Sequence, residues 1–163
     1  MTRSPETRAS KVRLLSVFLQ LGFVFGILPA AVVEGGQERW WGEPVERALG
    51  KAGDNRGELL SFLGKVSSER RPAAAFLVEN MPQRDLSTLK ADYLVENLRL
   101  AFEARAAAAW GGKLPEGVFL NDVLPYANAN EARESWRPSL REKCLPLVKD
   151  CKSPGEAAHE LNK

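Results

Sequence analysis

Apolar residues recur three or four positions apart along most of the chain after residue 40, which is the spacing of one face of an α-helix. Proline near the start and glycine or proline at the end mark the limits of several of these stretches. The pattern predicts successive helices over about 43–50, 58–66, 73–81 and 87–110. Gly111-Gly112 is expected to end the longest of them.

The last third of the chain continues the helical pattern. A short apolar stretch over 114–124 precedes a Pro-Tyr turn, and a further helix is expected from Asn130-Glu131 until Pro146 kinks or ends it. Ser153, Pro154 and Glu156 fit the N-cap, N1 and N3 positions of a final helix. One stripe of the preceding helix is expected to point into the core; it consists of Trp136, Leu140, Cys144 and Val148.

No alternating strand pattern of useful length is present. The fold class predicted is therefore all-α, with an N-terminal signal or anchor helix followed by a compact assembly of about five to six helices and no substantial sheet. Three parts are expected: residues 1–35 as signal or anchor, 36–69 as a helical lead-in, and 70–163 as the main helical region.

Residues 14–33 contain no charged side chain, and a basic stretch precedes them. This arrangement is typical of an export signal or a membrane anchor, and about 20 helical residues also suffice to cross a bilayer. Cleavage after Val33-Glu34-Gly35 and retention as a transmembrane helix both stay open, beside the third alternative of a buried core helix. No cysteine lies directly after the apolar residues 14–33, which excludes a lipid-anchored lipoprotein. We expect the later residues to lie outside the cytoplasmic membrane, or to be anchored to it.

The charge balance argues against nucleic-acid binding. The 163 residues contain 23 Lys and Arg against 21 Asp and Glu, a net charge of +2. Four of these basic residues but only one acidic residue precede position 14, so the remainder carries a net charge of −1. A nucleic-acid partner requires a basic face, which this remainder does not supply.

The residues that usually carry catalysis or bind metals are scarce. Two cysteines cannot form a disulfide framework, and with one histidine they cannot complete a structural zinc site without carboxylates. Cys144 and Cys151 are expected to be reduced core thiols. We considered a Cys151–His159 dyad and the carboxylate pair Glu131 and Glu134, and interpreted the first as a core thiol beside an exposed imidazole and the second as a solvated helix face. We accordingly assign no catalytic, cofactor-binding or metal-binding residue and expect no cofactor.

The segment around Pro125-Tyr126 combines aromatic, arginine and short polar residues, which predicts a rigid corner of the chain fixed by side-chain hydrogen bonds. In the structural interpretation, Trp136 anchors the core and Arg137 pairs with Glu131 or Glu134. In the functional interpretation, the same corner shapes a cleft floor or binds a peptide.

Four stretches, 71–82, 118–126, 130–138 and 157–162, together resemble the helical region upstream of the catalytic core in bacterial exported transglutaminase-like proteins. The resemblance implies that a papain-like core follows, in which a cysteine thiolate attacks an amide carbonyl with help from a histidine and an aspartate. Neither Cys144 nor Cys151 occupies the nucleophile motif, and the chain is expected to end before it and to be inactive as it stands. The implied partner is a protein or peptide substrate of the full-length protein, and the membrane if residues 14–33 are retained. The alternative is a small exported or membrane-tethered helical binding module.

Overall fold

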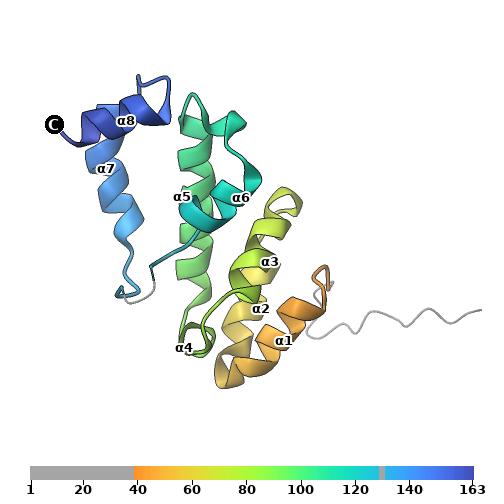
Figure 1. Cartoon of the computed structure of the whole chain (residues 1–163). Helices are drawn as coiled ribbons and strands as arrows, with labels where there is room; N and C mark the ends of the chain where they lie inside the picture. The colour runs from red at the N-terminus through yellow and green to blue at the C-terminus, as the bar shows by residue number, and fades with distance from the viewer. Residues whose placement is uncertain (1–38, 129–130) are drawn as a thin grey trace, which may run out of the picture. The chain divides into compact units, whose positions relative to one another are not determined.

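The computed structural model describes residues 39–128 and 131–163, and all the regular elements in these ranges are helical (Figure 1). The prediction of an all-α fold is thereby confirmed for this part of the chain. The longer helices are α1 (Glu43–Lys51), α2 (Arg56–Gly64), α3 (Arg71–Glu79), α5 (Ala91–Ala107), α7 (Trp136–Val148) and α8 (Pro154–Leu161). Two shorter ones are α4 (Gln83–Leu86) and α6 (Glu116–Val118), and a π-helical turn, Phe119–Val123, follows α6.

The apolar residues 14–33 lie outside the described residues, so the predicted signal or anchor stays a prediction. Among the helices of the described ranges, none combines the length and hydrophobicity needed to cross a bilayer.

Helix starts follow the local signals in the sequence. Proline occupies the first turn of α1, α3 and α8, where the missing N–H group has no helical partner to lose. At α8 the Ser153 hydroxyl accepts the Glu156 N–H at 3.2 Å, and the Glu156 carboxylate accepts the Lys152 N–H at 2.7 Å. The predicted cap at Ser153 is confirmed, because both side chains satisfy backbone groups that the helix leaves unpaired.

Two helices begin later than the apolar pattern predicts. α5 starts at Ala91 rather than near residue 87, because residues before it form α4 and a turn held by the buried Asn55. The Asn55 amide donates to the carbonyl oxygens of Leu86 and Leu89, at 3.0 and 2.8 Å. α7 starts at Trp136 rather than Asn130-Glu131, and it continues past Pro146 to Val148. Tertiary hydrogen bonds override local propensity at both starts.

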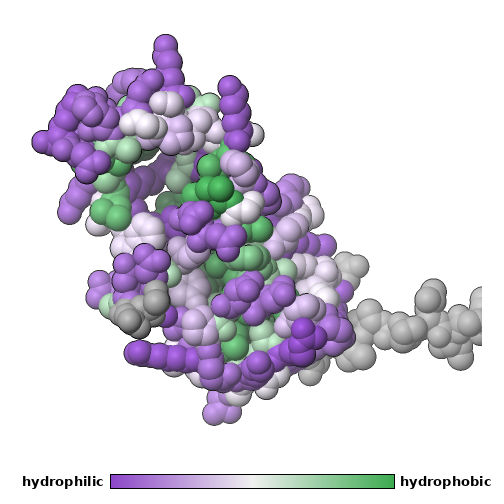
Figure 2. All heavy atoms as spheres, in the orientation of Figure 1, coloured by the Kyte–Doolittle hydropathy of each residue, from purple (hydrophilic) through white to green (hydrophobic). Residues whose placement is uncertain are grey.

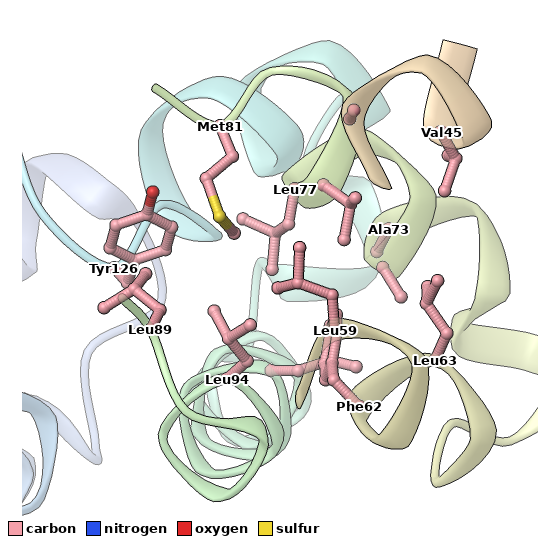
Figure 3. Packing of buried hydrophobic residues seen from close by; sticks show 14 of the residues in the cluster. Val45, Leu59, Phe62, Leu63, Ala73, Leu77, Met81, Leu89, Leu94 and Tyr126 are labelled. Carbon is pink, nitrogen blue, oxygen red and sulfur yellow. The ribbon is translucent and has the colours of Figure 1, made fainter. Parts of the chain in front are cut away.

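Helices α1 to α5 enclose the hydrophobic core. Figure 3 shows side chains from α1, α2, α3 and α5 gathered in one cluster, which includes the fully buried Leu59 and Phe62. α1 packs mainly on α3, and α2 on α5. Phe119, Leu124 and Tyr126 from the segment after α6 complete this core. By contrast, α7 has no buried residue and packs mainly on α8 (Figure 1).

Arg105 fixes the turn that follows α5. Its guanidinium donates to the carbonyl oxygens of Gly111 and Leu114, both at 3.2 Å, and to the Glu116 carboxylate at 2.8 Å. The backbone of Gly111 therefore lies very close to α5: a Cβ atom at this position would be only 1.7 Å from the Arg105 carbonyl oxygen. Only glycine fits there without movement of the backbone.

We expect Gly111→Ala to lower the free energy of unfolding by about 1–3 kcal/mol, because the new methyl group forces the turn away from α5. Gly112→Ala is the matched control, since a Cβ at Gly112 meets no atom within 4 Å. That control should change stability by less than about 0.5 kcal/mol. Urea denaturation followed by circular dichroism measures both, and equal effects of the two substitutions would contradict the close approach.

Candidate functional site

Among the residues that the structure describes, three polar side chains are buried, and two of them, Asp85 and Asn97, attach the chain after α6 to the helices before it. Asp85 in α4 is only 1% exposed, and its carboxylate accepts the Tyr126 hydroxyl at 2.9 Å. The same carboxylate pairs with the Arg133 guanidinium, which donates from Nη2 at 2.9 Å and from Nε at 3.0 Å. Because charged hydrogen bonds are stronger in surroundings that exclude water, this cluster holds Tyr126 and Arg133 firmly against α4.

The electrostatics of the cluster favour a neutral phenol and a charged guanidinium. Burial and the hydrogen bond to Asp85 raise the pKa of Tyr126 well above its ordinary value, and burial also raises the pKa of Tyr93. The hydrogen bond to Asp85 raises the pKa of Arg133. The Tyr126 hydroxyl therefore acts as a hydrogen-bond donor in a structural cluster and is poorly suited to act as a general base.

A second polar connection positions the start of α7. The buried Asn97 donates to the Leu124 carbonyl at 2.8 Å and accepts from Arg137 Nε at 2.5 Å. Arg137 also donates to the carbonyl oxygens of Val123 and Pro125. The predicted pairing of Arg137 with Glu131 or Glu134 is wrong, because the guanidinium donates its hydrogen bonds to these backbone and amide oxygens instead.

Trp136 contributes a hydrogen bond to the same corner. Its indole N–H donates to the Tyr126 carbonyl at 2.7 Å, and its ring is only partly buried. The Tyr93 hydroxyl lies within 3.3 Å of the Glu134 carbonyl oxygen and 3.4 Å of the Tyr126 one. The segment 131–135 is thus held in a non-helical conformation, which explains why Glu131 and Glu134 do not share a helix face.

Beyond this corner, α7 and α5 diverge and leave an apolar groove with a volume of about 350 Å³. Figure 2 shows the surface hollowed between these two helices, with hydrophobic side chains at the edge of the hollow. Its walls include Leu100, Ala104 and Ala107 from α5 and Leu140, Cys144 and Val148 from α7, together with Trp110 and Trp136. We call this feature the α5–α7 groove.

The stripe expected to enter the core lines this groove instead. Leu140 is 47% exposed and Cys144 is partly exposed, so the prediction that Cys144 is a core thiol is wrong. The stripe has the predicted four-residue spacing, but the helix that carries it packs mainly on α8 and makes few contacts with α5. An apolar stripe of this kind ordinarily packs against another element.

Cys151 and His159, which we considered as a dyad, line the same shallow cavity near α8. Cys151 is buried and unpaired, as expected of a reduced core thiol. Burial raises the pKa of its thiol, and the carboxylates of Glu160, Glu156 and Asp150 raise it further. These surroundings disfavour the thiolate that nucleophilic catalysis requires. In the described ranges, no three His, Cys, Asp or Glu side chains are grouped so as to hold a metal ion.

Asp85, Asn97 and Arg133 did not emerge from the sequence as important positions. Each is a polar residue of a type that is usually exposed, and its partner lies 27 to 48 residues away. The only local signal was the density of polar and aromatic residues around Tyr126, which correctly marked a hydrogen-bonded corner.

Comparisons with models of protein families, with curated proteins and with solved structures give no match.

We expect Asp85→Ala to lower the free energy of unfolding by about 2–4 kcal/mol, because it leaves the Tyr126 hydroxyl and the Arg133 guanidinium without their buried acceptor. Asp92→Ala is the control: Asp92 also forms an ion pair, with Lys65 at 2.7 Å, but its side chain is 90% exposed. That pair should contribute less than about 1 kcal/mol. Comparable losses in urea denaturation would show that the Asp85 cluster has no special role.

Proposed function

We propose that the described helices form a non-catalytic docking module and that another polypeptide segment packs into the α5–α7 groove. The observation that carries this proposal is the uncovered apolar stripe of α7. A soluble helix seldom keeps an apolar stripe exposed along its length unless a partner covers it.

The groove offers enough apolar surface for such a contact. Fully burying an aliphatic side chain contributes about 1.5–3 kcal/mol, and several partly exposed ones line the two helices. A fixed apolar surface also costs little conformational entropy on binding, and the start of α7 is already held by Arg137 and Trp136. Docking therefore requires no rearrangement of the helices that carry the groove.

A catalytic role for the described residues is less well supported. Cys151 is surrounded by carboxylates that raise its pKa, and Cys144 lies in an apolar groove without an adjacent imidazole among its lining residues. Acyl transfer requires an activated thiolate and donors for the oxyanion in one cleft.

We further propose that the module belongs to an exported transglutaminase-like protein, whose catalytic groups lie outside these helices. The stretches that resemble this family, 118–126 and 130–138, supply Tyr126, Trp136 and Arg137 to the hydrogen-bonded corner. The alternative is an exported or membrane-tethered binding module without catalytic partners. Translating the gene beyond codon 163 separates them: a cysteine, a histidine and an aspartate in frame favour the first, and a stop codon favours the second.

The docking role is tested with a neutral amphipathic helical peptide of about fourteen residues, carrying leucines on one face and glutamines beside them. Bound peptide should shield Cys144, so at about ten times the dissociation constant its alkylation slows about ten-fold. The full-length chain is held in phosphatidylcholine nanodiscs, and peptide mass mapping measures the alkylation of Cys144 and of Cys151 separately. Cys151 is the internal reference for folding, because it is buried.

Two leucine substitutions provide the matched comparison. Leu140 and Leu161 are 47% and 48% exposed, but only Leu140 lines the groove. Leu140→Asp should weaken the shielding of Cys144 about ten-fold or more, because docking would bury a charge. Leu161→Asp should leave it unchanged. No shielding of Cys144 in the unsubstituted chain, or equal loss in both variants, would contradict the docking role.

A further inference from the structure

The charges of the α5–α7 groove all have one sign. Its charged lining residues are Arg137, Arg141 and Lys149, and none of the described residues that line it is acidic. The described part of the chain is otherwise rich in carboxylates that pair with nearby cations, such as Glu46 with Arg56 and Asp92 with Lys65. An apolar floor and a basic rim therefore occur together at this groove.

Two of the three cations remain accessible to a partner. The Arg137 guanidinium already donates hydrogen bonds to Asn97 and to the carbonyl oxygen of Pro125, so it is the least available of the three. Arg141 lies 3.7 Å from Glu103, a carboxylate that also accepts a shorter hydrogen bond from Arg99. Lys149 forms no ion pair with any residue in the described ranges and is exposed. Arg141 and Lys149 thus supply positive charge that the described residues neutralise weakly or not at all.

The walls of the groove favour a helical partner over an extended one. An extended peptide gains its affinity from an exposed strand edge, and the described ranges contain no strand. Ala104 and Ala107 lie three residues apart near the end of α5, and Ala108 follows directly after it; these small side chains permit close approach of another helix. The 13 residues of α7 extend about 20 Å, which corresponds to nearly four turns of a partner helix.

We infer that the occupant of the groove is an acidic amphipathic helix, with an apolar stripe that faces α5 and α7 and carboxylates that face Arg141 and Lys149. This inference rests on the proposed docking function and specifies its partner. Because Arg141 and Lys149 are eight residues apart on one helix, they are separated by about 12 Å along its axis. The two carboxylates of a partner helix should accordingly be seven or eight residues apart.

The test uses three versions of the helical peptide, with glutamate, glutamine or lysine at two flanking positions about seven residues apart. Shielding of Cys144 from alkylation again gives the affinity, in the full-length chain in phosphatidylcholine nanodiscs at low salt. The glutamate peptide should bind about ten-fold more tightly than the glutamine peptide, and the lysine peptide about ten-fold more weakly. The difference should shrink as salt is added, because rim charges are screened.

Charge-reversed variants locate the effect. Arg141→Glu and Lys149→Glu should each lower the ratio of the affinities for the glutamate and glutamine peptides about ten-fold. Lys143→Glu is the control and should leave this ratio unchanged, because Lys143 is exposed on α7 outside the groove. If Arg141→Glu unfolds the chain, the buried Cys151 thiol becomes reactive toward alkylation and reveals it. The preference for the glutamate peptide is then measured in Lys149→Glu alone.

The outcomes separate the two proposals. Equal shielding by all three peptides overturns the acidic helix but leaves the docking function intact, whereas no shielding by any peptide overturns both. If Cys144 becomes shielded as the protein concentration rises, with no peptide present, the occupant is a second copy of the chain. If a free fatty acid shields Cys144 and none of the peptides does, the occupant is a small amphiphile. Either result also overturns the acidic helix.

Discussion

The placement of the last third of the chain depends on one almost fully buried carboxylate. Asp85 is part of α4, which packs against α1, and its oxygens accept from Tyr126 and Arg133, more than 40 residues later. A carboxylate in such surroundings is costly unless its acceptor positions are filled, so the two donors are required wherever the helices α1 to α5 are folded. Tyr126 and Arg133 consequently have one favoured position each, and α7 begins three residues after Arg133.

The corner also explains why a groove is present. Asn97 and Arg137 attach the start of α7 to α5 through polar contacts, which are directional and do not require the rest of α7 to follow the surface of α5. α7 therefore diverges, and α8 packs on it instead of on the main core. Directional contacts at one end and an apolar stripe beyond them together give a rigid, uncovered groove, which is the arrangement that a docked helix needs.

Much of the helical fold was predictable because its signals are local. Prolines in the first turns and the Ser153 cap act within a few residues, and the predicted helices over 43–50, 58–66 and 73–81 lie within about two residues of α1, α2 and α3. The corner was predicted as a hydrogen-bonded element from the residues near Tyr126. Its partners were not, because Asp85 and Asn97 lie on helices whose polar residues look like solvent-facing ones in sequence.

The burial of α7 was the main error, and its cause is physical. A four-residue apolar spacing shows that one side of a helix is apolar, but it does not show what covers that side. Trp136 and Cys144 have the pattern of core residues, and they line a groove between helices. Whether such a stripe enters a core depends on where the helix is attached, and that attachment is made by side chains far away in sequence.

The central claim is that the Asp85 cluster fixes the start of α7, so that α7 depends on the cluster more strongly than α2 and α3 do. Amide hydrogen exchange in Arg133→Gln tests it most directly, because this substitution removes the charged donor and leaves the hydrophobic core unchanged. The account predicts that exchange accelerates much more for the amides in residues 124–128 and in α7 than for those of α2 and α3. Uniform acceleration across all helices, or no acceleration in α7, would contradict it.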